Sequence, residues 1–240
     1  MLRKIYDSLL TVVYPQACAL CENSVENSAD GVACRNCWKK SRIFSGAETL
    51  CRKCGAFLQE KPSDFEAFCH ACDDHAYDAA SAVGIYEHAL SASILHLKTE
   101  SFVPKNLRQL FIDAFENSAF QDAAKIIPVP LSKKRLLERG FNQAAVPAQI
   151  LARHTKIDLD EQSLARTIHT PMHRAAMDKR ARELTVKNAF EVKRPKLIEN
   201  ENILLVDDVF TSGATASNCA KALKKNGAGK VYVLTLARAN

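Results

Sequence analysis

The hydrophobic pattern divides the chain into two parts at about residue 78. From residue 79 onward, short apolar runs alternate with segments whose apolar residues recur at helical spacing. We expect strands near residues 80–87, 124–130, 202–208 and 230–238, and helices near residues 91–100, 106–120, 141–155 and 213–226. Strands that alternate with helices are typical of a parallel α/β sheet, so residues 79–240 are predicted to form one α/β domain.

Residues 1–78 have few long apolar runs and contain eight of the nine cysteines. The eight form four Cys-x-x-Cys pairs, and each half of the region has two pairs separated by a spacer of 12 or 14 residues. Two such pairs supply the four thiolates that Zn²⁺ prefers in tetrahedral sites. We therefore expect a small N-terminal domain, residues 1–78, that holds a helix and a double zinc ribbon.

The simplest pairing gives two structural Zn²⁺ ions, because every ligand then comes from the protein. The first ion would be bound by Cys18, Cys21, Cys34 and Cys37, and the second by Cys51, Cys54, Cys69 and Cys72. A crossed pairing, in which the first pair joins the third and the second joins the fourth, stays open.

The N-terminal sequence and the net charge bear on the location of the protein and on its possible ligands. Apolar residues recur at near-helical spacing over residues 2–13, and Asp7 interrupts the run that a signal peptide would need. We expect an amphipathic helix there, no membrane span and a cytoplasmic location. The net charge of +6 is compatible with a polyphosphate substrate or a nucleic acid.

An acidic pair follows the buried run 203–206. Ligands of open α/β sheets bind at the carboxyl ends of the strands, so Asp207 and Asp208 are expected at the crevice, where carboxylates can accept hydrogen bonds from the hydroxyls of a ribose. Next comes a loop of small residues at the start of a helix: Thr211, Ser212, Gly213, Ala214 and Thr215. Free amides at a helix start favour a phosphate. The pattern predicts a ribose 5-phosphate site; an ordinary capped helix is the structural alternative.

The stretch ILLVDDVFTSGAT resembles the 5-phosphoribosyl-1-pyrophosphate (PRPP) motif of type I phosphoribosyltransferases. The order of four Cys-x-x-Cys pairs, IIPVPLSKKRLLERGFNQA and this motif resembles the ComF/GntX family along nearly the whole chain. The resemblance implies a Rossmann-like phosphoribosyltransferase fold behind a zinc-binding region. It also implies a link to natural transformation, the uptake or processing of single-stranded DNA.

If the chain is a phosphoribosyltransferase, as the resemblance implies, Mg²⁺ binds together with PRPP and the protein offsets the remaining charge of the pyrophosphate. The segment after the strand at 124–130 offers four cations, of which we favour Arg135 and Arg139 over Lys133 and Lys134 because the guanidinium binds phosphate in a bidentate way. Lys98 resembles a lysine that the family places after a short apolar helix. Asp207 and Asp208 would anchor the ribose and stabilise positive charge at its C1 atom.

The chain departs from the family pattern in the segment 170–190, a predicted flap over the substrate. His173 and Thr185 stand where the family has glutamine and asparagine, which leaves the acceptor open, whereas the pattern is kept at Thr170, Pro171, Arg182, Ala189 and Phe190. Three histidines are candidates for proton transfer, although each is more typical of an ordinary polar position: His154, His169 and His173.

Two further functions stay open beside the PRPP-dependent enzyme. A non-catalytic protein could bind single-stranded DNA by stacking bases on aromatic residues of the ribbons, namely Trp38, Phe57, Phe65 and Phe68, next to Arg35, Lys39, Lys40, Arg52 and Lys53. The structural reading, that these aromatic residues pack around the metals, is favoured. A scaffold whose ribbons bind competence or helicase-type proteins is the third hypothesis.

Overall fold

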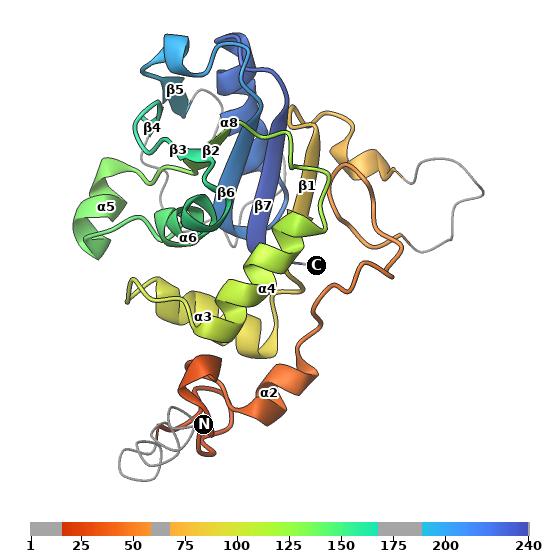
Figure 1. Ribbon diagram of the computed structural model, residues 1–240, viewed down its shortest axis with the longest axis vertical. Helices are drawn as coiled ribbons and strands as arrows, with labels where there is room; N and C mark the ends of the chain where they lie inside the picture. The colour runs from red at the N-terminus through yellow and green to blue at the C-terminus, as the bar shows by residue number, and fades with distance from the viewer. Residues whose placement is uncertain (1–15, 59–67, 168–188, 240) are drawn as a thin grey trace.

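The computed structural model describes residues 16–58, 68–167 and 189–239. Its centre is a parallel five-stranded sheet with the order β1-β7-β6-β2-β3 (Figure 1). The strands are β1 (Ala79–Ala82), β2 (Lys125–Pro128), β3 (Asp158–Leu159), β6 (Ile203–Phe210) and β7 (Val231–Arg238). The expected parallel sheet is thus confirmed.

Helices cover both faces of this sheet. One face carries α3 (His88–Leu97), α4 (Lys105–Glu116) and α6 (Ala145–Thr155), and the other carries α8 (Ala214–Lys225). Strand β6 serves both cores, because successive residues point to opposite faces. Leu204 and Val206 pack in the core of the three helices, whereas Ile203 and Leu205 pack in the core of α8. This alternation decides where the acidic residues further along β6 point.

Three predicted elements differ in detail from the structure. The first strand ends at Ala82, and the chain then makes single bridges from Gly84 to Ile43 and from Ile85 to Arg238. Strand β6 continues to Phe210, because β7 stays paired with it to its end. The helix predicted from residue 141 begins at Ala145, and its third residue is Pro147, whose missing N–H costs no hydrogen bond in the first turn.

A second sheet lies beside the α8 face. It pairs β4 (Leu164–Arg166) with β5 (Phe190–Val192) in antiparallel fashion, and Leu164 and Phe190 join the core of α8. Two further short helices are α5 (Lys133–Arg139), which follows β2, and the 3-10 helix η3 (Pro195–Leu197), which follows β5. The predicted flap falls mostly between β4 and β5, and its residues 168–188 lie outside the described part of the chain.

The cysteine region packs against the sheet domain at two separate places (Figure 1). Its described elements are η1 (Ser28–Asp30), α2 (Arg35–Lys40) and η2 (His70–Cys72). The first half lies against α3, and the second half lies beside β1. The expected N-terminal helix at residues 2–13 is outside the described residues. Over the described ranges, every helix is too short or too polar to cross a bilayer.

Candidate functional site

The acidic pair lies where the chain order of the sheet reverses. From β2 the chain runs outward to β3, and from β6 it runs outward to β7 on the other side. Strand β2 ends opposite Val206, and beyond it β6 is paired with β7 alone, at Asp207, Val209 and Phe210. The edge of this end of β6 on the β2 side has no strand partner in the described sheet. Such a switch point is the usual ligand crevice of an open α/β sheet.

Asp207 and Asp208 leave β6 on opposite sides, as the alternation of the strand requires. Asp208 follows Leu204 and Val206 to the side of α3, where its Oδ2 lies 3.7 Å from Nζ of Lys98. The side chain of Asp208 is only 12% exposed, so this lysine, the residue after α3, is its main counter-charge. The structure therefore brings Lys98 to the acidic pair.

Asp207 is on the side of α8. Burial raises its pKa well above the ordinary value, and the negative charge of Asp208 raises it further. The positive charge of Arg166, at the end of β4, acts in the opposite direction. The guanidinium of Arg166 lies 5.4 Å from the ring centre of Phe190. The negative charge of Asp208 is thus offset by Lys98, and that of Asp207 is offset in part by Arg166 of the small sheet.

The loop after β6 leads directly into α8. Gly213 precedes the helix with a φ of 75°, a conformation that glycine adopts at little cost. The N–H of Ala214 donates to Oγ of Ser212 at 3.4 Å. Within the described part of the chain, the backbone N–H groups of Gly213, Thr215 and Ala216 have no recorded acceptor. These amides, at the positive end of the helix dipole, suit a phosphate group.

The segment after β2 is anchored near the same end of the sheet. Ser132 caps α5 by accepting from the N–H of Arg135, and Asn142 donates to the carbonyl of Val129 at 3.1 Å. Arg139 donates to Oε1 of Gln143 at 2.6 Å. Among the described ion pairs, neither predicted arginine contacts the acidic pair. Lys133 and Lys134 are exposed at the start of α5, as expected of a solvated helix.

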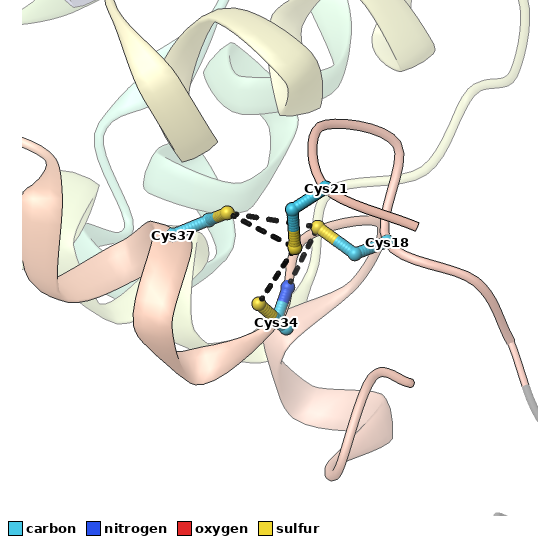
Figure 2. A group of neighbouring side chains, drawn as sticks. All are labelled: Cys18, Cys21, Cys34 and Cys37. Atoms are coloured by element: carbon cyan, nitrogen blue, oxygen red, sulfur yellow. Dashed lines mark hydrogen bonds between the residues drawn. The ribbon is translucent and has the colours of Figure 1, made fainter. Parts of the chain in front are cut away.

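The two halves of the cysteine region form two four-thiol clusters. Figure 2 shows the first, where Cys37 of α2 and Cys34 just before it meet Cys18 and Cys21 from the preceding loop. The sulfur–sulfur distances recorded there are 3.6, 3.7 and 3.8 Å. A tetrahedron with Zn–S bonds of about 2.3 Å has edges of about 3.8 Å, so the cluster has the right size for Zn²⁺.

The second cluster has the same construction. Its members are Cys51, Cys54, Cys69 and Cys72, with sulfur–sulfur distances of 3.4 and 3.6 Å. The simple pairing is therefore correct and the crossed one is excluded. His70 ligates in neither cluster, because its imidazole lies at the surface, 3.5 Å from Asp73. Two structural zinc ions fit the chain.

The same hydrogen bond recurs in both clusters. The N–H of Cys34 donates to the sulfur of Cys18 and the N–H of Cys69 to that of Cys51, each at 3.3 Å. Burial alone would raise the thiol pKa values, but these and further backbone donors lower the pKa of Cys18 to about 6 and of Cys51 to about 7. Burial and crowding among the thiols raise the pKa of Cys37 to about 12. Zinc binding must therefore release protons.

The other sequence candidates lie away from the crevice or outside the described residues. His154 has a carboxylate partner that the sequence did not reveal, Glu116 at 2.8 Å, but both side chains are on the surface of α6 and α4. Trp38 packs in the core, and its indole N–H donates to the carbonyl of Asp30, as the structural reading expected. The undescribed candidates are Phe65, His169, Thr170, Pro171, His173, Arg182 and Thr185.

Two residues of the crevice were missed by sequence reasoning. Arg166 ends a three-residue strand, too short for an alternating pattern to reveal. Tyr86 follows β1, and its pKa is raised by burial and by the charge of Asp208, which places its phenol near that carboxylate. The available signal for Tyr86 was its position in the predicted strand 80–87, whereas no predicted strand lay near Arg166.

A model of the double zinc ribbon domain matches residues 9–74 of the chain. Together with the parallel sheet and the two four-thiol clusters, this match defines a zinc-ribbon protein with a parallel α/β domain. Competence protein F of Haemophilus influenzae is 30% identical over 234 residues, which cover 92% of this chain and 96% of that protein. The DNA utilization protein YhgH of Escherichia coli K12 is 31% identical over 238 residues, covering 96% and 99%. The chain belongs to the ComF family.

Among solved structures, the glutamine PRPP amidotransferase from B. subtilis, complexed with ADP and GMP, is 18% identical and aligns with 73% of this chain and 33% of its own, at a TM-score of 0.37. A similarity of this size supports no conclusion about the ligand of this chain.

Proposed function

We propose that this chain binds Mg²⁺-PRPP in the crevice beyond β2 and acts as a phosphoribosyltransferase in the uptake or use of DNA. The observation that carries the proposal is the junction of Asp207 and Asp208 with the unpartnered amides of the loop 211–216 at the switch point of the sheet. Carboxylates accept from the ribose hydroxyls, and the amides donate to the 5-phosphate. The names of the relatives support the DNA context.

Each charged residue of the crevice then has a role. We expect Lys98 to exchange its contact with Asp208 for the pyrophosphate, and Arg166 to offset part of the cost of ionising the buried Asp207. Bound Mg²⁺ would neutralise pyrophosphate charge as the bond to ribose C1 breaks. Arg135 and Arg139 remain predicted pyrophosphate contacts, because they lie on the segment anchored to the end of β2.

The direct test is calorimetric titration of the zinc-loaded protein with PRPP and Mg²⁺. We expect binding by the wild type and its loss when Asp207→Ala and Asp208→Ala are combined. Asp113→Asn is the matched control, because this acid is on the half-buried side of α4, away from the acidic pair, and its carboxylate accepts a hydrogen bond from Gln109 of the same helix. Equal PRPP affinity in the double variant and the wild type would reject the site. Release of pyrophosphate with nucleic-acid fragments as acceptors tests the transfer.

A second function, binding of single-stranded DNA, is favoured by two exposed aromatic residues of the second ribbon. Phe57 is 44% exposed and Phe68 is 51% exposed, in contrast to the packing expected of them. Arg52 and Lys53 lie in the same ribbon. Stacking of bases on aromatic rings stabilises binding by about 1–3 kcal/mol per base. Affinity for an oligonucleotide should fall steeply with salt and fall again in Phe57→Ala with Phe68→Ala, and a lack of binding at low salt would exclude it. Helicase-type partners stay a prediction.

A further inference from the structure

The loop 211–216, here called the phosphate loop, is closely packed at Gly213. A β-carbon added to Gly213 would lie 2.8 Å from Cζ of Phe210, 3.1 Å from Nε2 of His75 and 3.1 Å from the hydroxyl of Tyr77. Three side chains thus lie close to Gly213, the last of the three residues that link β6 to α8. The loop has the shape that these side chains allow.

Two of the three side chains belong to the segment that leaves the second cysteine cluster. Cys72 is the last ligand of that cluster, and residues 75–77 follow at once. The rings of His75 and Tyr77 are stacked with centroids 5.1 Å apart, and Tyr77 is 1% exposed. Between them, the N–H of Ala76 donates to Oγ of Ser217 in the first turn of α8 at 3.1 Å. The segment is therefore fixed at one end by the cluster and at the other by the helix behind the loop.

Phe210 is held by the same cluster from a second direction. Its ring meets the edge of Tyr77 at 5.8 Å between centroids, and the guanidinium of Arg238 lies 5.0 Å from its centre. The same guanidinium donates a hydrogen bond to the carbonyl of Cys54, a ligand position of the second cluster. Phe210 directly precedes the loop and is only 5% exposed. It cannot shift unless Tyr77 or Arg238 shifts too.

The first cluster has no such connection among the described residues. Its cysteines pack with Ala89 of α3 and with Trp38, on the far side of the sheet from α8. Further links of this half to the sheet domain include the hydrogen bonds from Asn106 of α4 to Asp30 and from the N–H of Ala89 to Oγ of Ser41. By contrast, Cys51, Cys54 and Cys72 share one core with Tyr77, Phe210 and the α8 residues Ala216, Cys219 and Ala220.

We propose that the second cysteine cluster positions the phosphate loop through Tyr77 and Arg238, so that zinc in this cluster, and not in the first, is required for the loop to bind a phosphate ester tightly. The inference rests on the proposed function for its ligand. Its structural part, the control of the loop by the cluster, can be measured without any ligand. The second zinc ion is then a part of the PRPP site, although none of its ligands faces the substrate.

The test compares two matched double variants of the full chain. Cys51→Ser with Cys72→Ser removes two ligands of the second cluster, and Cys18→Ser with Cys34→Ser removes two of the first; all four residues are 1% exposed. Mass spectrometry should find one zinc ion fewer in each. Hydrogen exchange of the amides of residues 211–217 should become faster by about tenfold or more in the first variant and stay unchanged in the second. PRPP affinity should follow the same pattern.

The inference is overturned if the amides of residues 211–217 exchange at the wild-type rate in the Cys51→Ser, Cys72→Ser variant. It is also overturned if they exchange equally fast in both cysteine variants. If the wild type binds no PRPP, the proposed function fails, while the exchange comparison still decides this proposal. A second pair of variants keeps the full zinc content and covers the case in which a cysteine variant does not fold. Tyr77→Ala should accelerate loop exchange and weaken PRPP binding, and Tyr77→Phe, which keeps the ring, should restore both. Equal behaviour of the two substitutions would contradict the role of the ring.

Discussion

Substitution of Gly213 by alanine tests the enclosure of the phosphate loop. The residue has a φ of 75°, and a left-handed conformation costs alanine roughly 1–2 kcal/mol. The new methyl group would also lie 2.8 Å from Cζ of Phe210. Phe210 is buried between Tyr77 and Arg238, so its ring cannot turn aside freely. Overpacking of this kind costs typically 1–3 kcal/mol. We expect Gly213→Ala to lower the free energy of unfolding by about 2–5 kcal/mol.

Gly46 provides the matched control. Its φ is 86°, and a β-carbon there would meet nothing within 4 Å. Gly46→Ala therefore has the same backbone strain and the same change in the unfolded chain, but no steric conflict. Urea denaturation of the two zinc-loaded variants should show Gly213→Ala to be less stable than Gly46→Ala by about 1–3 kcal/mol. Equal losses in the two variants would show that Phe210, His75 and Tyr77 do not press on the loop.

Three further measurements follow from the site. Because burial raises the folded-state pKa of Asp207, its stabilising contribution is complete at low pH and is lost as the pH rises through the raised value. Asp207→Asn should flatten this decline in urea titrations between acidic and neutral pH, and an unchanged slope would contradict it. Tyr77→Phe removes a buried hydroxyl without a recorded partner and should raise the free energy of unfolding by about 1 kcal/mol; a loss in thermal unfolding would mean that the hydroxyl is paired. The purified protein should contain two zinc ions, and their removal by a chelator at low pH, where thiols regain protons, should destabilise it.

The sequence predicted the elements whose signals are local. The buried run 203–206, the glycine before α8 and the spacing of the cysteines each depend on residues close together in the chain. The division of the cysteines into two clusters was the simplest choice, and it is confirmed by the sulfur–sulfur distances.

Features that depend on distant partners could not be predicted. Strand β6 extends to Phe210 because Arg238 of β7 stays opposite it, and that register is not visible in either segment alone. Arg166 reaches the neighbourhood of Asp207 only because the small sheet lies against the α8 face. The alternation of β6 puts the carboxylates of Asp207 and Asp208 on opposite faces of the sheet, and the prediction that both accept hydrogen bonds from a ribose did not include this. The sequence did contain this alternation, but the length of the strand was needed to apply it.

The place of β7 in the sheet has a consequence for biosynthesis. Strand β1 has β7 as its sheet partner, with Ala79 opposite Tyr232, and β7 also completes β6. A ribosome therefore releases β1 long before the strand that pairs with it exists. Until then, the edge of β1 and the apolar residues beneath it stay open to chaperones or to other nascent chains. Contacts between residues so distant in the chain slow folding. The pairing of β1 must therefore follow translation of β7.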